Sequence, residues 1–136
     1  MVPNYSIWLI PSSESNDLLG RLIKKTCSYF SCSIFSPHCT LIGGLKKPIL
    51  GIIDLVDSCR KKSTELSCET NGLKIGEPPW KVFYIDLRSN SKIFDIQKYF
   101  SNRISSDIDY SFDPHLSLVY GRFNDKDLKG RIKNIH

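Results

Sequence analysis

Apolar and polar positions follow the same order in two separate stretches of the chain. Each stretch opens with a run of apolar, β-prone residues, Tyr5–Ile10 and Val82–Leu87, which is typical of a buried strand. A polar cluster follows and supplies side chains that can cap a helix. Apolar residues then recur near helical spacing. They are Leu18, Leu19, Leu22, Ile23 and Phe30 in the first stretch, and Ile93, Ile96, Phe100 and Ile104 in the second.

Each helical pattern leads into a motif that occurs twice. Residues 35–44 read F-S-P-H-C-T-L-I-G-G and residues 112–121 read F-D-P-H-L-S-L-V-Y-G. Both fit the pattern F-x-P-H-x-[T/S]-L-x-x-G, at an offset of 77 positions. Without gaps, residues 5–44 align with residues 82–121. The sequence therefore predicts an internal repeat in which strand, helix and strand follow each other twice.

The segments outside the repeat predict fewer elements. Residues 48–59 have the pattern of an amphipathic helix, and the cations of residues 60–62 suit its carboxyl end. Two short β-like stretches are expected around residues 64–69 and 72–75. Residues 124–135 predict a last helix, after which the chain stops at His136.

Length and composition indicate one ordinary globular domain, residues 1–136. The chain is 40% hydrophobic and 24% charged, with a net charge of +5. This mild excess of cations suits an anionic ligand and equally a solvated surface. The amino terminus lacks the pattern of a signal peptide, and no apolar run is long enough to span a membrane. Five cysteines without a CxxC pair are expected to be reduced thiols of a cytoplasmic protein, and no metal site is expected.

The duplicated motif carries the candidate chemistry. In a strand, residues i and i+2 point to the same face, so His38 is expected beside Thr40 and His115 beside Ser117. Two imidazoles suit acid–base catalysis near neutral pH, and two hydroxyls can donate hydrogen bonds to phosphate oxygens. One histidine could activate water while the other protonates the leaving oxygen, which would need neither a metal nor a cofactor.

A structural explanation competes with this interpretation. A single histidine at the start of a strand is more often a surface or core residue than a catalyst, but two copies in matching contexts favour function. The third histidine, His136, stands outside the motif and is expected to be uninvolved. Aromatic residues that could stack on a base or ribose are Trp8, Trp80, Tyr84 and Tyr120, whereas Tyr5, Phe35 and Phe112 are expected to fill the core.

The paired motifs resemble those of the two-histidine phosphoesterase superfamily. Within it, residues 5–11 (Y-S-I-W-L-I-P) and 114–120 (P-H-L-S-L-V-Y) are most similar to the cyclic phosphodiesterases of plants and fungi. The resemblance covers residues 5 to about 132. It implies an α+β, bilobed fold, with two antiparallel β-sheets related by pseudo-two-fold symmetry around a central groove and helices outside. Family members continue beyond the last helix, so their C-terminal strands are expected to be missing here.

The resemblance also implies an activity and roles for individual residues. It implies metal-independent hydrolysis of ADP-ribose 1″,2″-cyclic phosphate or of nucleoside 2′,3′-cyclic phosphates. His38 and His115 would be the acid–base pair, Thr40 and Ser117 would bind the phosphate, and Tyr120 would contact the substrate. The expected partner is a small cyclic phosphate or nucleotide, with no membrane, no cofactor and a monomeric chain.

Two alternatives to a small-molecule hydrolase remain. One is an enzyme of the same superfamily that acts on RNA ends, either on 2′,3′-cyclic termini or as a 2′,5′ RNA ligase-like enzyme. The cationic residues are dispersed, however, and form no long basic stripe. The other is a module that binds nucleotides or RNA without turnover, although simple binding does not require both histidines and both hydroxyls.

Overall fold

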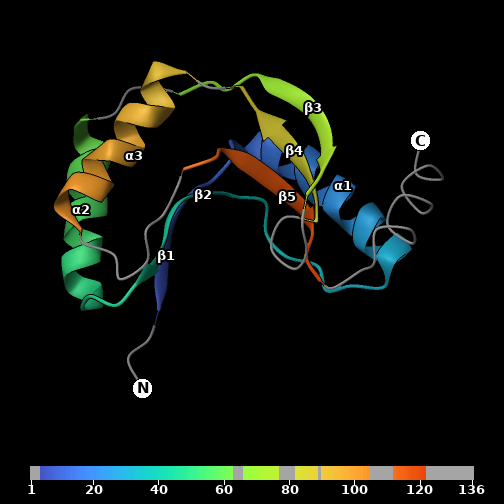
Figure 1. The fold of residues 1–136 in the computed structure, drawn as a ribbon, viewed down its shortest axis with the longest axis horizontal. Helices are drawn as coiled ribbons and strands as arrows, with labels where there is room; N and C mark the ends of the chain where they lie inside the picture. Colours follow the sequence, from blue (N-terminus) through green and yellow to red (C-terminus); the bar gives the residue numbers. More distant parts are fainter. Residues whose placement is uncertain (1–3, 63–65, 77–81, 89, 105–111, 122–136) are drawn as a thin grey trace. The chain divides into compact units, whose positions relative to one another are not determined.

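The computed structural model describes residues 4–62, 66–76, 82–88, 90–104 and 112–121. The elements run in the order β1 (Tyr5–Leu9), α1 (Ser13–Phe30), β2 (Cys39–Leu45), α2 (Ile49–Lys62), β3 (Thr70–Ile75), β4 (Phe83–Leu87), α3 (Ser91–Arg103) and β5 (His115–Val119) (Figure 1). The fold is α+β with two antiparallel sheets, as predicted, and both halves of the repeat contain strand, helix and strand.

Most sequence-predicted elements lie where the pattern placed them, with one exception. Of the two β-like stretches expected after α2, only the second is a strand, β3. Residues 66–69 have no regular structure. The helix predicted for residues 124–135 lies outside the described residues. Within the described part of the chain, no helix is long and apolar enough to cross a bilayer.

The chain divides into two compact units, and each combines parts of both repeats. The two-strand unit consists of residues 1–9, 40–69 and 88–114, and it contains β1, all of β2 after Cys39, α2 and α3. The three-strand unit consists of residues 10–39, 70–87 and 115–136, and it contains α1, β3, β4 and β5. The helix of the first repeat is therefore grouped with the strands of the second.

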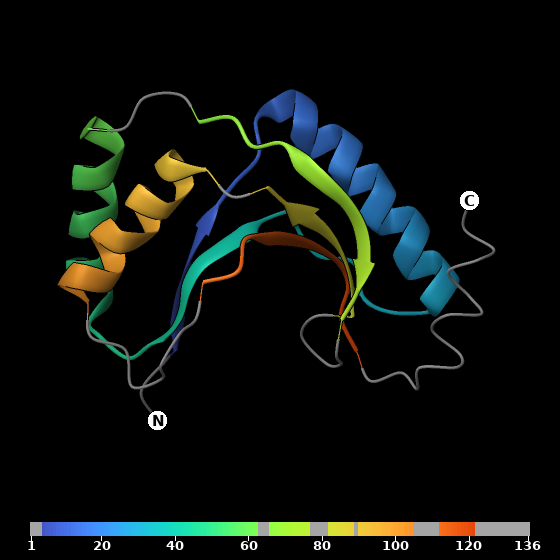
Figure 2. The same ribbon diagram turned by 45° about the horizontal axis from the view of Figure 1, so that its top comes forward.

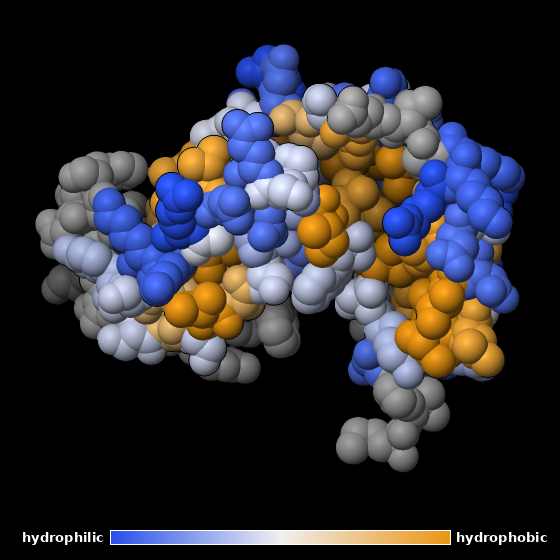
Figure 3. Space-filling model, turned by 180° about the vertical axis from the view of Figure 1, so that it is seen from behind, coloured by the Kyte–Doolittle hydropathy of each residue, from blue (hydrophilic) through white to orange (hydrophobic). Residues whose placement is uncertain are grey.

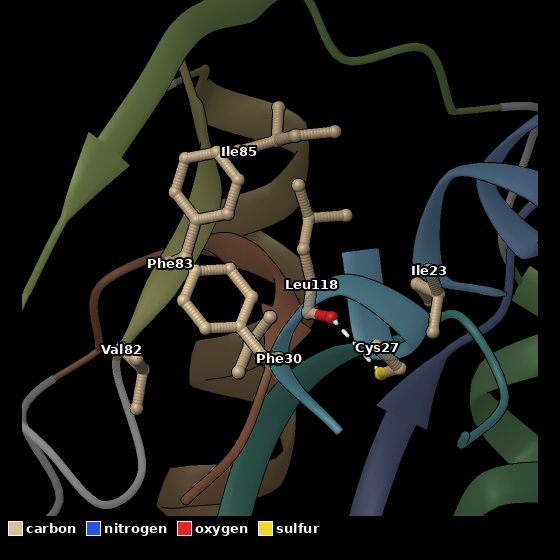
Figure 4. Packing of buried hydrophobic residues seen from close by; sticks show 8 residues of the cluster. Ile23, Cys27, Phe30, Val82, Phe83, Ile85 and Leu118 are labelled. Atoms are coloured by element: carbon tan, nitrogen blue, oxygen red, sulfur yellow. Dashed lines mark hydrogen bonds between the residues drawn. The ribbon is translucent and has the colours of Figure 1, made fainter. Parts of the chain in front are cut away.

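The three-strand unit is an antiparallel sheet of order β3-β4-β5 with α1 packed on it (Figure 2). The apolar stripe of α1 contacts the face of the sheet that carries Phe83 and Leu118. Figure 4 shows this core, in which Ile23, Cys27 and Phe30 come from α1. Each of the large side chains buried here stabilises the fold by about 1.5–3 kcal/mol. The core therefore fixes which face of β5 points away from α1.

The buried Cys27 thiol ties α1 to β5 directly. Its sulfur donates to the backbone oxygen of Leu118 at 3.6 Å (Figure 4). The backbone oxygen of Ser33 lies 3.4 Å from the same sulfur. Burial, with a smaller effect of the neighbouring Cys32, raises the pKa of Cys27 to about 12. The thiol is therefore protonated at neutral pH and acts as a core donor, not as a nucleophile.

The two-strand unit pairs β1 with β2 and contains two helices in contact, α2 and α3 (Figures 1 and 2). Strand β2 is its most buried strand, with Leu41, Ile42 and Leu45 almost fully covered. Helix α3 begins at a well-formed cap, because the side chain of Asn90 accepts a hydrogen bond of 2.9 Å from the Ile93 amide. Such a cap stabilises a helix by about 1 kcal/mol.

Some large apolar side chains remain at the surface. Leu50 of α2 and Leu18 of α1 are among the most exposed, at 72% and 61%. Figure 3 shows such apolar surface as separate orange patches among polar side chains. Part of the surface of every globular protein is apolar, so these patches by themselves assign no function.

Candidate active site

The structure brings both motif histidines into the three-strand unit. His115 is the first residue of β5, and His38 lies directly before β2. His38 is buried, at 7% exposure, whereas His115 is partly exposed. Burial is the main cause that lowers the pKa of His38, and the nearby charge of His115 adds a smaller decrease. Two residues 77 positions apart in sequence are thus electrostatically coupled.

The imidazole of His38 is held in one orientation by the backbone. Its Nδ1 lies 2.8 Å from the carbonyl oxygen of Ser36. A carbonyl only accepts hydrogen bonds, so Nδ1 carries the proton and Nε2 has the lone pair in the neutral ring. Burial is the main cause that lowers the pKa of His38, while the bond to Ser36 opposes this effect. The site therefore holds a neutral imidazole with a basic Nε2 at neutral pH.

Tyr120 contacts the basic nitrogen of His38. Its hydroxyl lies 3.3 Å from Nε2 and can donate to that lone pair. The phenol ring also packs against Phe35, with 4.5 Å between ring centroids. Burial raises the pKa of Tyr120, so the phenol stays protonated and available as a donor. The sequence assigned Phe35 to the core, but it is only partly buried and supports this tyrosine as well as the core.

A β-bulge explains why Tyr120 reaches the histidine face. Tyr84 pairs with Ser117, and Phe83, which precedes Tyr84 in β4, pairs with Val119. Leu118 is therefore an extra residue in β5. An inserted residue reverses the alternation of side chains beyond it. Strict alternation would place Tyr120 on the face opposite His115. The bulge removes this conflict.

Ser117 has a buried hydroxyl that is unusual in its lack of partners. The residue is 4% exposed, and among the described residues its Oγ makes no hydrogen bond. It is nevertheless near enough to Tyr120 to oppose part of the pKa increase that burial causes there. A buried hydroxyl without a partner is energetically unfavourable, by about 1–3 kcal/mol. Such a group is suited to donate to a ligand oxygen.

The fourth motif residue, Thr40, belongs to the two-strand unit. It is the second residue of β2 and is partly exposed. The structure therefore groups His38, His115, Ser117 and Tyr120 in one unit, and Thr40 belongs to the other. Its predicted role in phosphate binding stays a prediction.

Strand β4 contributes two side chains beside His115. The ring of Tyr84 meets the imidazole edge to face, with centroids 5.3 Å apart. Asp86 is the direct cross-strand partner of His115. Asp86 was not among the predicted site residues, although a single acidic residue within an otherwise apolar strand was a usable signal.

A separate cavity lies within the two-strand unit and contains none of the predicted site residues. It has a volume of about 270 Å³ and is lined mainly by α2 and α3, with Cys59, Lys62, Lys92 and Tyr99 among its walls. Within the described ranges, no group of three or more histidine, cysteine, aspartate or glutamate side chains is arranged to hold a metal ion.

Comparison with known proteins adds no assignment. No family model matches the sequence, and no curated protein matches it at a significant level.

Proposed function

We propose that the protein is a phosphodiesterase that hydrolyses small cyclic phosphates without a metal, with His38 and His115 as its acid–base pair. The observation that carries this proposal is the coupling of two motif histidines in one unit, next to a buried hydroxyl that lacks a partner. The substrate class comes from the resemblance of the paired motifs to the two-histidine phosphoesterases. It comprises ADP-ribose 1″,2″-cyclic phosphate and nucleoside 2′,3′-cyclic phosphates.

The surroundings of the two histidines favour different roles. His38 is neutral at neutral pH and has its lone pair on Nε2, so it suits the general base. It would take a proton from water as the water oxygen attacks phosphorus. The phosphorus–oxygen bond to one ribose oxygen would break, and His115 would give its proton to that oxygen. Exchange with solvent then restores both protonation states, and each proton transfer accelerates the reaction by about 10²–10⁴-fold.

The hydroxyl groups would stabilise the phosphate during this reaction. Ser117 would donate to a non-bridging oxygen, where negative charge develops. Tyr120 marks the space next to His38 Nε2, so water or a substrate oxygen would replace its hydroxyl there. Thr40 is expected to donate in the same way as Ser117. The pseudo-two-fold arrangement of both sheets around a central groove is part of the same resemblance and stays a prediction.

The direct test is turnover of defined substrates. Purified protein is incubated with the four nucleoside 2′,3′-cyclic monophosphates and with ADP-ribose 1″,2″-cyclic phosphate, each with and without EDTA. We expect conversion to monoesters that EDTA does not reduce. If EDTA abolishes turnover and a divalent metal restores it, the mechanism is wrong. If no substrate is converted, the hydrolase proposal fails.

An RNA-end enzyme of the same superfamily is the second candidate, because the chain has a net charge of +5. A salt series separates the two. Contacts along an RNA backbone weaken steeply as salt increases, whereas a pocket for one cyclic phosphate loses much less affinity. The same series also tests the non-catalytic RNA-binding alternative, which predicts salt-sensitive binding without turnover.

A further inference from the structure

Asp86 lies beside His115 because of the register of the sheet. Strands β4 and β5 pair antiparallel, with Asp86 opposite His115 and Tyr84 opposite Ser117. Directly opposed side chains on one face have Cβ atoms about 4.5–5.5 Å apart. A carboxylate and an imidazole at this spacing are within reach of a hydrogen bond.

Two side chains of β3 hold the Asp86 carboxylate in place. Lys74 Nζ lies 2.8 Å and Asn71 Nδ2 lies 3.1 Å from the same oxygen, Oδ2. The Asp86 side chain is only 17% exposed, against 47% for Lys74. The ammonium of Lys74 stabilises a negative charge on Asp86, and Asp86 in turn raises the pKa of Lys74. The carboxylate is thus a fixed anion on the histidine face of the sheet.

Among the residues that the structure describes, Asp86 is the anionic side chain that faces His115 from a neighbouring strand. Among the described residues, Tyr84 of β4 contacts this imidazole and His38 is close enough to interact with its charge. Lys74 lies one strand further away. Asp113 precedes the strand by two residues and is exposed. Water screens an exposed charge more effectively than a largely buried one, so Asp86 has the stronger influence on His115.

We propose that Asp86 is a positioning residue, which orients the imidazole of His115 and favours its protonated form so that His115 is the proton donor. This inference rests on the proposed function. A carboxylate that accepts a bond from one ring nitrogen fixes the orientation of the imidazole and stabilises the positive charge. The other nitrogen is then directed at the substrate. Lys74 limits the effect, since its own charge partly neutralises Asp86.

Two substitutions should change His115 in opposite directions. Asp86→Asn keeps the shape and removes the charge, so His115 should release its proton at lower pH, by about one unit. Lys74→Met removes the competing cation, so His115 should release its proton at higher pH. Asp113→Asn is the matched control, because it removes an exposed anion close in sequence to His115, and we expect no comparable change.

The experiment combines two measurements on the full chain. NMR titration follows the ring resonances of His115 in the resting protein, and initial rates with a nucleoside 2′,3′-cyclic phosphate give the dependence of kcat on pH. With Asp86→Asn, both the NMR midpoint and the alkaline limb of the rate profile should move to lower pH. Lost turnover should recover when the pH is reduced, which a merely structural role would not produce.

The outcomes separate this inference from the hydrolase proposal. If the wild-type protein converts no cyclic phosphate but Asp86→Asn still moves the His115 midpoint, the hydrolase proposal fails and the coupling stands. If the midpoint stays in place in Asp86→Asn, or changes equally in Asp113→Asn, the positioning role is overturned. Should Asp86→Asn fail to fold, Lys74→Met decides, since an unchanged or lower midpoint there contradicts the proposal.

Discussion

The two copies of the motif share their sequence pattern but differ in their surroundings. His38 lies before its strand, is buried, and has Nδ1 bound to a backbone carbonyl. His115 begins its strand, is partly exposed, and stands opposite an aspartate. A buried ring with a fixed lone pair suits a base, and a ring beside an anion suits an acid. The repeated motif has a histidine at both positions, and tertiary contacts give the two histidines different surroundings.

The end of each motif shows the same divergence. At the offset of 77 residues, Tyr120 corresponds to Gly43. A Cβ atom at Gly43 would lie 3.3 Å from the hydroxyl oxygen of Ser6, which leaves little space for a side chain. In the second copy, the bulge at Leu118 turns the corresponding position toward His38. The two copies thus differ at this position, and in the described structure the second copy supplies a tyrosine beside His38.

The largest expected effect comes from removal of either histidine. His38→Ala and His115→Ala should each reduce kcat by about 10²–10⁴-fold, because each removes one proton transfer. The double variant should lose far less than the product of the two, since the pair acts as one unit. Steady-state kinetics with circular dichroism measures both activity and folding.

His136→Ala provides the control for these variants, because this histidine lies outside the motif. It should retain wild-type activity. Full activity in either folded motif variant would show that this histidine has no catalytic role. The assignment of one histidine as base and the other as acid would then be wrong.

The hydroxyl residues should have a smaller effect. Ser117→Ala and Thr40→Ala each remove one donor to a charged oxygen, worth about 1.5–3 kcal/mol, or roughly 10- to 150-fold in kcat/KM. Ser117→Ala should lose activity without a marked loss of thermal stability, because the buried Oγ makes no hydrogen bond among the described residues. Thermal unfolding checks this point. A marked decrease in stability would show that Ser117 serves the fold.

A still smaller effect is expected at Tyr120. Tyr120→Phe keeps the ring on Phe35 and removes a hydroxyl that is expected to contact the substrate once it is displaced from His38 Nε2, so activity should decrease by roughly 2- to 10-fold. Tyr120→Ala should cost more, since the packing is lost too. Equal losses in the two variants would mean that the hydroxyl accounts for the whole contribution, and equal activity to wild type would exclude Tyr120 from the site.

The smallest effect is the dependence of stability on pH that His38 contributes. Its pKa is lowered in the folded state, so the unfolded chain binds more protons around pH 6. Stability from this group is therefore present above its ordinary pKa near 6.5 and is lost as the pH falls through the folded value. His38→Gln should flatten the decrease in denaturation midpoint between pH 7.5 and 5. An unchanged pH dependence would show that burial of His38 has no such effect.

The sequence predicted the elements well, because helix and strand periodicities depend mainly on local patterns. The predicted polar clusters contain the residues that cap α1 and α3, Ser12 and Asn90, and the spacing of apolar residues placed both helices correctly. Strand β3 was predicted two residues too short, because its first two residues, Thr70 and Asn71, are polar and exposed. The grouping of α1 with β4 and β5 was also not predictable, since it depends on contacts between distant segments.

Prediction of the site was equally uneven. The repeated motif singled out His38, His115 and Ser117 as candidates, and the resemblance added Tyr120. The structure groups these four residues in one unit. It gave no indication of which histidine would be the base. That information depends on the Ser36 carbonyl, on burial and on the cross-strand position of Asp86. These are properties of the folded chain, so only the structure distinguishes the two copies.

The central claim is that the two histidines have different roles. It is tested most directly by how the activity of each histidine variant depends on the leaving group of the substrate. The His38→Ala and His115→Ala variants are compared on a nucleoside 2′,3′-cyclic phosphate and on a 4-nitrophenyl phosphodiester of the same nucleoside, whose leaving group departs without a proton. If His115 is the acid and His38 the base, the activated substrate should restore much of the activity of His115→Ala and little of that of His38→Ala. Equal restoration in both variants, or restoration in His38→Ala alone, would contradict the assignment.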